Sequence, residues 1–389
     1  MRLDVLVFGG GAAGLWCLDR LRRAGYHAIL LESQALGSGQ TIQAQGIIHG
    51  GGKYALRGVR DFAAARATSL MPERWRRAIA GDLEPDLTGT EILAERCHLW
   101  LPRGSALARL QSLGFMGLVA RAGLLATEPH KLSKVEWPEA LRDCACAVYS
   151  LAEPVIATGS FLKALAERHR GFIFLYDGAA ARFSESAVRI GEVVLKARAI
   201  VLAAGTGNED LVKKAGIQSA LMQRRPLGMA LVRGNLPPLF GHCIVGGKTG
   251  LTITTPAAGL WQIGGEIAER IGAEPDDAAA RKLALAEIRR LLPRVDLRAA
   301  EMSVYRAVRA EAQTAALRRP SGVHANRIAP GLVVAWPTKL ALAPVLADEV
   351  LAIVQHELKA PAGYRETPPW PMPAVAPYPW QEAEWFAVP

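Results

Sequence analysis

The sequence predicts an α/β fold in which a Rossmann-like domain is interleaved with an α+β domain built on a mixed or antiparallel sheet. Residues 5–32 read as an apolar strand, a glycine-rich turn, an amphipathic helix and a second apolar strand. Short, almost wholly apolar segments return at 199–205 and 332–336, and such runs are typical of buried parallel strands. Between residues 91 and 149, short apolar runs alternate with turns, as in an antiparallel sheet.

The glycine-rich turn has the spacing of a dinucleotide-binding motif. Gly9 makes the tight turn, Gly11 lets a pyrophosphate approach the backbone, and Gly14 packs the helix on the strand. Glu32 ends the second strand, where its carboxylate can accept both hydroxyls of an adenosine ribose and repel a 2′-phosphate. We therefore expect a bound dinucleotide, with its pyrophosphate at the helix N-terminus. A tight turn that binds nothing is the alternative.

Composition and charge narrow the class of protein. Half of the 389 residues are hydrophobic, which is enough for two interleaved domains with their own cores. The chain has no uninterrupted apolar run of about eighteen residues and no basic leader before an apolar segment, so we expect a cytoplasmic protein without a transmembrane segment or signal peptide. The net charge of +10 is spread along the predicted helices, which favours attraction of anionic ligands over nucleic-acid binding. Solvated helix faces alone would also explain this charge.

The cysteines give no sign of a disulfide framework. There are five, an odd number, and they are scattered along the chain, which suits a reducing compartment. Only Cys144 and Cys146 are close together. Because no second Cys or His cluster stands at metal-binding spacing, we expect a structural pair and no metal site.

The other elements are predicted from local patterns. Residues 37–54 form a loop so rich in glycine that its backbone can approach a ligand closely, and the pattern is helical from 54 to 80. Further along we expect a capped helix at 158–165, a strand at 172–176, a charged amphipathic helix at 276–292 and a helix that begins near Pro344. Beyond Leu358 a tail rich in proline and tryptophan has no periodicity, so we expect it to wrap the surface. Contact with a membrane or a partner is the alternative for this tail.

These elements predict a discontinuous division of the chain. The dinucleotide-binding domain is expected at 1–80, 151–207 and 326–358, the substrate domain at 81–150 and 208–325, and the tail at 359–389.

The order of four segments resembles that of the flavoprotein family of D-amino-acid oxidase, glycine oxidase and glycerol-3-phosphate dehydrogenase. The segments are 9–32, 158–165 with Ala179 and Ala180 beyond, 199–205, and 331–349. In that family the bound dinucleotide is FAD, so the resemblance implies FAD as the cofactor. A second small-residue strand far downstream is a flavoprotein feature, which argues against a nicotinamide enzyme.

Two shorter stretches resemble particular members of the family. Residues 45–54 are similar to the Ile-His-Gly-Gly-x-Arg-Tyr segment of glycerol-3-phosphate dehydrogenases and to the Val-Ile-His-x-Gly segment of L-2-hydroxyglutarate oxidases, with Lys53 in place of arginine. Residues 338–340 resemble the Gly-Lys-Leu turn of the former, although Trp336, Pro337 and Thr338 replace the glycines that usually precede the lysine. These departures leave the substrate open and do not affect the cofactor.

Three residues are candidates for catalysis. Residues 305–309 resemble the strand on which amine oxidases of the family carry an arginine that grips the substrate carboxylate, which implies this role for Arg309 although Ala310 replaces a proline. A surface arginine is the alternative. His49 is the candidate base for an alcohol substrate because imidazole titrates near neutral pH. It could instead satisfy backbone groups or bond covalently to the flavin. Lys339, before a helix, could stabilise negative charge on the reduced ring.

The resemblance implies an FAD-dependent oxidoreductase, an oxidase or a dehydrogenase, that takes a hydride from a carbon bearing an amine or hydroxyl on a small anionic substrate. A glycerol-3-phosphate or 2-hydroxy-acid dehydrogenase that passes electrons to a quinone or carrier rather than to oxygen stays open. So does a flavin-binding sensor or partner-binding protein without turnover. The predicted cofactor-binding residues are Gly9, Gly11, Ala12, Ala13, Gly14, Glu32, Ser33, Gln40, Thr41, Gln45, Gly46, Ile47, Ala180, Ala204, Gly205, Thr338, Lys339 and Leu340. His242 and Lys248 stand in a glycine-rich segment and carry no predicted role.

Overall fold

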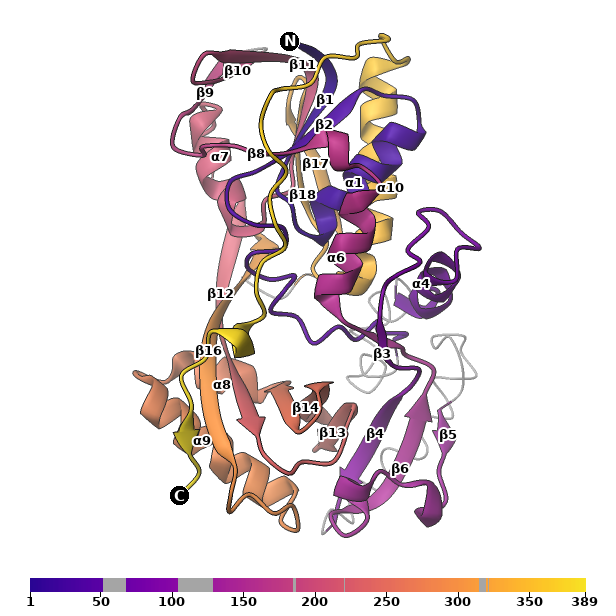
Figure 1. Ribbon diagram of the computed structural model, residues 1–389, viewed down its shortest axis with the longest axis vertical. Coiled ribbons are helices and arrows are strands. Elements are labelled where there is room, and N and C mark those ends of the chain that lie inside the picture. Colours follow the sequence, from indigo (N-terminus) through magenta and orange to yellow (C-terminus); the bar gives the residue numbers. More distant parts are fainter. Residues whose placement is uncertain (52–67, 104–128, 185–186, 220, 315–319, 321) are drawn as a thin grey trace.

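The protein is built on two large sheets that lie at opposite ends of an elongated molecule (Figure 1). The computed structural model describes residues 1–51, 68–103, 129–184, 187–219, 221–314, 320 and 322–389. Each sheet has its own hydrophobic core, and the long strands β12 (Met222–Arg233) and β16 (Glu301–Ala312) run from one end of the molecule toward the other. The sheets therefore meet at the middle of the molecule, where the predicted site residues gather.

The first sheet has a parallel centre. In the order β17-β18-β11-β1-β2-β8 it contains His324–Ala329, Leu332–Trp336, Val193–Leu202, Arg2–Phe8, Ala28–Glu32 and Ile173–Leu175. From β18 to β8 the paired strands are parallel, whereas β17 and the hairpin of β9 (Ala181–Ser184) and β10 (Ala187–Ile190) pair antiparallel. The predicted strands at 199–205 and 332–336 are confirmed as buried parallel strands that lie close to β1.

Helices cover one face of this sheet. They are α1 (Ala12–Arg23), α6 (Thr158–Glu167) and α10 (Ala343–Leu358), which stand side by side in Figure 1. Their apolar faces pack with the sheet around the fully buried Trp16, Phe161 and Leu346. The opposite face is covered in part by α7 (Asn208–Lys214). Because both faces are covered, six consecutive residues of β1 are buried, and the sequence shows them as a continuous apolar run interrupted only by Asp4.

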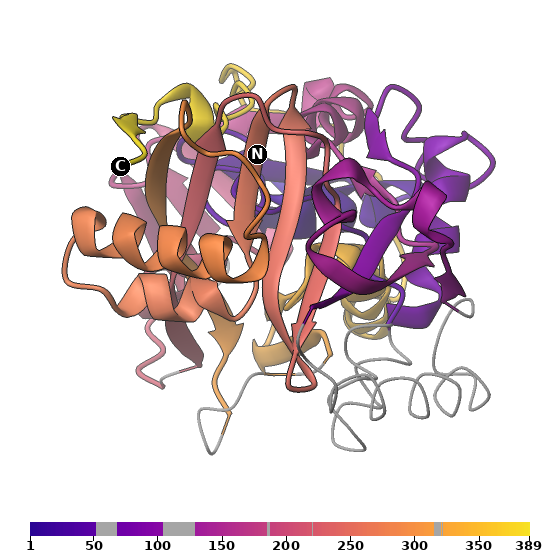
Figure 2. The same ribbon diagram turned by 90° about the horizontal axis from the view of Figure 1, so that it is seen from below.

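The second sheet is mixed. In the order β19-β16-β12-β15-β14-β13-β4-β6-β5 it contains Phe386–Ala387, Glu301–Ala312, Met222–Arg233, Leu260–Gly264, Lys248–Ala257, Gly241–Val245, Cys97–Pro102, Ala145–Leu151 and His130–Lys131. All neighbours are antiparallel except β13 and β4. Figure 2 shows α8 (Ile267–Ala273) and α9 (Asp277–Leu291) packed against this sheet. The side chain of Asp276 accepts a hydrogen bond from the backbone N–H of Ala279 and caps α9.

The tail links the two ends of the molecule. It runs along the first sheet, where Leu36 donates its N–H to the carbonyl of Ala374 at 2.8 Å, and ends as β19 beside β16 (Figure 1). Two cation–π contacts, of Arg233 of β12 with Trp385 and of Arg281 of α9 with Phe386, hold its last residues against the second sheet and its helix. The predicted surface wrapping is confirmed.

Most of the predicted elements are present in the described residues. The helices expected at 158–165, at 276–292 and near Pro344 are α6, α9 and α10. Of the helix expected at 54–80, residues 52–67 lie outside the described residues, and α4 (Met71–Ile79) is its described part. A small separate sheet pairs β3 (Ile92–Ala94) with β7 (Val155–Ile156). The domain boundaries stay a prediction, which the separation into two large sheets supports. None of the described helices is long and apolar enough to cross a membrane.

Candidate active site

At the glycine turn, the backbones of β1, α1 and the end of β11 are in close contact. Gly9 has a φ of +105°, and a Cβ placed on it would lie 2.5 Å from the Cα of Ala204. A Cβ on Gly14 would lie 1.8 Å from the carbonyl oxygen of Gly9. Only glycine fits at these two positions, and the absence of a side chain lets the end of β11 and the start of α1 pack directly on the turn. This is the geometry that the sequence motif predicts.

The carboxylate of Glu32 is fixed beside this turn. Its Oε2 accepts the N–H of Gly10 at 2.6 Å, and its Oε1 accepts the N–H of Gln34 at 2.9 Å. The following loop is held on the helix N-terminus, because the hydroxyl of Thr41 accepts the N–H of Ala12 at 3.1 Å. The acid at the end of β2 therefore faces the first turn of α1, as ribose recognition requires.

A cleft of about 420 Å³ opens between the glycine turn, the end of β11 and the turn after β18. Twelve of the predicted cofactor residues line it: Gly9, Gly11, Ala12, Ala13, Glu32, Gln40, Thr41, Ala204, Gly205, Thr338, Lys339 and Leu340. Gln45, Gly46 and Ile47 line the cavity next to it, whereas Gly14, Ser33 and Ala180 line neither. The side chain of Gln45 is itself occupied, since its amide donates to the carbonyls of Thr252 and Gln262, both at 2.9 Å.

A second cavity of about 210 Å³ continues this cleft toward the other sheet. The two share residues of the loop at 40–44, of β16 at 307–309 and of the turn at 338–340. The three predicted catalytic residues, His49, Arg309 and Lys339, all line this second cavity. They come from three distant parts of the chain and converge where the two sheets meet.

His49 lies against a buried acid that the sequence reasoning missed. Its Nδ1 is 3.3 Å from Oε2 of Glu153, and Oε1 of the same carboxylate accepts the N–H of Gly50 at 2.7 Å. The ring of His242 lies 5.4 Å from that of His49, with its Nε2 4.0 Å from the same Glu153 oxygen. Glu153 follows the apolar strand β6, and an acid within an apolar region is the only signal that could have marked it.

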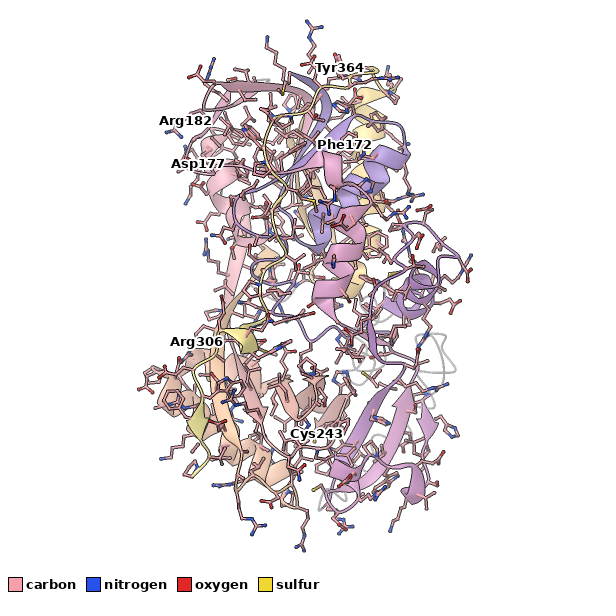
Figure 3. All side chains as sticks on the ribbon, in the orientation of Figure 1. Phe172, Asp177, Arg182, Cys243, Arg306 and Tyr364 are labelled. Atoms are coloured by element: carbon pink, nitrogen blue, oxygen red, sulfur yellow. The ribbon has the colours of Figure 1, made fainter. Side chains whose placement is uncertain are left out.

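Arg309 lies near a second buried acid. It is directly opposite Arg225 of β12, and the Glu311 carboxylate approaches both guanidinium groups. Glu311 is fully buried, with Oε1 3.9 Å from Nε of Arg309 and Oε2 3.4 Å from Nη2 of Arg225. The neighbouring Arg306, labelled in Figure 3, is instead paired with Asp277 of α9 at 2.9 Å. Of these two arginines of β16, Arg309 is the one that lines the second cavity.

Hydrogen bonds tie the loop at 40–48 to the second sheet. The hydroxyl of Tyr305 donates to the carbonyl of Gln43 at 2.8 Å, and the amide of Gln262 donates to that hydroxyl at 2.6 Å and to the same carbonyl at 2.9 Å. Burial raises the pKa of Tyr305, so the hydroxyl keeps its proton and stays a donor. The loop is thus fixed between the sheets, and it forms one wall of the second cavity.

Comparison with known proteins identifies the class. A family model described as FAD dependent oxidoreductase matches residues 4–349, and the chain belongs to this family, as the resemblance predicts. A probable FAD-dependent oxidoreductase of Pseudomonas aeruginosa, PA4991, is 38% identical over 392 residues, which is 98% of either chain. The protein is therefore an FAD-dependent oxidoreductase.

Solved structures agree with this assignment. The crystal structure of PA4991 from Pseudomonas aeruginosa matches with a TM-score of 0.82 and 34% identity and covers 98% of both chains. Glycine oxidase from Geobacillus kaustophilus matches with a TM-score of 0.64 at 19% identity, covering 92% of this chain and 95% of that one. L-α-glycerophosphate oxidase from Mycoplasma pneumoniae matches with a TM-score of 0.64 at 16% identity, covering 97% of this chain and all of that one. At these identities the last two show a shared fold.

The first cleft fits FAD on the evidence of its own residues. Gly9, Gly11, Ala12 and Ala13 line the cleft without a side chain larger than a methyl group, the N-terminus of α1 faces the opening, and Glu32 stands at the end of β2. Gly9, Gly11 and Glu32 would hold the adenosine diphosphate part. The continuous second cavity leaves room for a substrate beside His49 and Arg309.

Proposed function

We propose that this enzyme oxidises a small anionic compound bearing an amine or a hydroxyl, by hydride transfer to FAD. The observation that carries the proposal is the convergence of His49, Arg309 and Lys339 on a cavity continuous with the dinucleotide cleft. This cavity, about 210 Å³, is smaller than the ~300–1,000 Å³ of sites for drug-sized ligands. Its size favours a small substrate.

The charges around the cavity favour an anion. Two acids line it, but each faces a cation: Glu266 lies 3.9 Å from Lys248, and Glu269 lies 3.8 Å from Arg225. Arg309 presents a planar fork of donors that matches a carboxylate or a phosphate, and the carboxylate of the buried Glu311 lies 3.9 Å from its Nε. We propose that Arg309 binds the anionic end of the substrate and so orients its reacting carbon.

The residues around the reacting carbon have distinct roles in this proposal. FAD, when bound, accepts the hydride of the substrate C–H bond. His49 accepts the hydroxyl proton of an alcohol, whereas an amine can lose its proton without a base. Lys339, at the start of the turn that leads into α10, supplies positive charge toward the cofactor. The cofactor contacts in this proposal are the predicted residues that line the cleft, and the electron acceptor is oxygen or a quinone or carrier.

Replacement of His49 tests the proposal. In rapid-mixing experiments without oxygen, His49→Ala should slow flavin reduction by an alcohol substrate on the order of a hundredfold or more, as for loss of a general base. The matched control is His356→Ala, which removes an exposed histidine of α10 that lines neither cavity. Reduction of the His49 variant at the wild-type rate would exclude the base role.

A further inference from the structure

Glu153 and His242 are the buried titratable groups that stand directly behind the proposed base and have no role in the proposed function. The side chain of Glu153 is 4% exposed and that of His242 is fully buried. A carboxylate this deeply buried is costly unless hydrogen bonds and opposite charge compensate it. Here Gly50 donates to one oxygen, and the rings of His49 and His242 both approach the other.

The hydrogen bond to Glu153 decides which nitrogen of His49 is basic. An ionised carboxylate can only accept, so Nδ1 of His49, 3.3 Å away, must carry the proton. The lone pair of the neutral ring is then on Nε2. Because Gly50 follows His49 and is bound to the same carboxylate, the backbone of the loop and the ring are positioned together.

We propose that Glu153 is a positioning residue for His49: it holds the tautomer with a basic Nε2 and stabilises the positive charge that the ring gains. This inference rests on the proposed role of His49 as base. In the reaction the substrate O–H bond breaks and its proton goes to Nε2, the electron pair of that bond forms the C=O bond, and the C–H pair leaves as hydride to the flavin. The imidazolium that results lies beside the Glu153 carboxylate.

His242 completes the cluster from the second sheet. Its Nδ1 is 2.9 Å from the hydroxyl of Thr252, and its Nε2 faces Glu153. Thr252 lines the cavity, so the strand β14 ties this ring to the cavity wall. The other charged groups that line the cavity with His49 are Glu266, Glu269, Arg309 and Lys339. Among the described contacts, Glu153 lies within hydrogen-bonding distance of the His49 ring.

The same three side chains are of the types that also ligate divalent cations, but the distances favour the hydrogen-bonded pair. Their candidate ligand atoms lie within 4.8 Å of one another. Zinc ligands at about 2.0–2.1 Å in a tetrahedron lie roughly 3.3 Å apart. The His49–Glu153 distance of 3.3 Å fits, but the His242–Glu153 distance of 4.0 Å does not. Metal binding is therefore the competing outcome of the experiment.

Glu153→Gln removes the negative charge and keeps the shape of the side chain. With glycerol 3-phosphate and a set of 2-hydroxy acids as substrates, we expect flavin reduction to slow by roughly a hundredfold to ten-thousandfold. The acid limb of the kcat/KM profile should move to lower pH, because the imidazolium loses its counter-charge. Glu153→Asp keeps the charge and should restore much of the rate together with the wild-type acid limb. A purely structural role of Glu153 would leave the position of the acid limb unchanged.

A matched control exists in the same chain. Asp19 and His169 form another buried carboxylate–histidine pair, with Oδ1 3.1 Å from Nε2, and neither residue lines the two cavities. Asp19→Asn makes the same chemical change and should leave the pH profile of oxidation as it is. A substrate-free readout is the nitrogen NMR spectrum of the histidines, assigned with His49→Ala: wild type should show the His49 ring protonated at Nδ1, and Glu153→Gln should lose this preference.

The outcomes separate the two proposals. If His49→Ala reduces the flavin at the wild-type rate, the proposed function fails. If that variant is slow but Glu153→Gln keeps the rate, the pH profile and the tautomer, only the inference about Glu153 is wrong. Stoichiometric zinc in the holoenzyme by elemental analysis, lost in His242→Ala and in Glu153→Gln, would also overturn it. Should Glu153→Gln fail to retain FAD, the rate and tautomer of Glu153→Asp decide. A Glu153→Asp variant that loses the preference for a proton on Nδ1 of His49 but keeps the wild-type rate and acid limb would contradict the inference.

Discussion

Replacement of Gly14 by alanine tests whether the glycine turn sets FAD affinity. Alanine is the better helix former by about 1 kcal/mol, so within α1 the substitution would stabilise the helix if space allowed. A Cβ at this position, however, would lie 1.8 Å from the carbonyl oxygen of Gly9, where real Cβ atoms stay beyond 3.0 Å. The helix and the turn must therefore separate by more than 1 Å.

The steric term is the larger of the two. Overpacking costs about 1–3 kcal/mol or more, and this contact with rigid backbone belongs at the upper end. After subtraction of the helix gain, about 2 kcal/mol remains. The turn can relax in the apoprotein but must return to its native position when FAD binds, so the cost falls on binding. We expect FAD to bind roughly thirtyfold more weakly.

The assay is titration of apoprotein with FAD, followed by quenching of flavin fluorescence. Gly171→Ala is the matched control, because a Cβ on Gly171 would point into open space and Gly171 does not line the cleft. We expect the control to bind FAD within about twofold of wild type, below the ~1.4 kcal/mol that a tenfold change represents. Wild-type affinity in Gly14→Ala would refute the steric reasoning.

Three further predictions concern the second cavity and the stability of the fold. Arg309→Ala should raise KM for an anionic substrate by about thirtyfold, as for loss of a hydrogen bond to a charged group, and for an uncharged analogue much less; equal effects in steady-state assays would remove Arg309 as the anion-binding residue. Tyr305→Phe should lower stability by about 1 kcal/mol and Tm by roughly 2 °C, since the Gln43 carbonyl loses one donor; an unchanged Tm in calorimetry would contradict this. Burial alone would raise the pKa of Asp19, but hydrogen bonds from His169 and Arg23 outweigh it and hold the pKa below its ordinary value. Asp19 should therefore stabilise the fold fully above its unfolded pKa of about 3.9, and this contribution should be lost as the pH falls through the lower folded value. In urea unfolding the difference between wild type and Asp19→Asn should shrink between pH 5 and pH 3, and a constant difference would refute it.

The first sheet could be predicted because its signals are local. The glycine spacing, the apolar strands and Glu32 lie within one short segment, and each glycine has a steric reason that the structure shows at Gly9 and Gly14. The strand that carries Arg309 was also accessible, through its resemblance to a known pattern. For these elements, neighbours in sequence are neighbours in space.

The surroundings of the cavity could not be predicted, because they depend on register between distant strands. Glu153 meets His49 across 104 residues, and Tyr305 meets Gln43 across 262. Nothing in the composition of either segment indicates its partner. The buried acid Glu311 reaches Arg225 only because β12 and β16 pair in one particular register. Such contacts become visible when the topology is known.

The proposed function is tested by anaerobic mixing of the purified holoenzyme with amino acids, N-methyl amino acids, 2-hydroxy acids and glycerol 3-phosphate, while the visible absorption band of the flavin is followed. We expect at least one small anionic compound to bleach this band. Bleaching that is fast in wild type and slow in Arg309→Ala would support the proposed substrate cavity, and readmission of air would then distinguish an oxidase from a dehydrogenase. If none of these compounds bleaches the band although FAD is bound, the proposal that the enzyme oxidises a small anionic substrate in this cavity is contradicted.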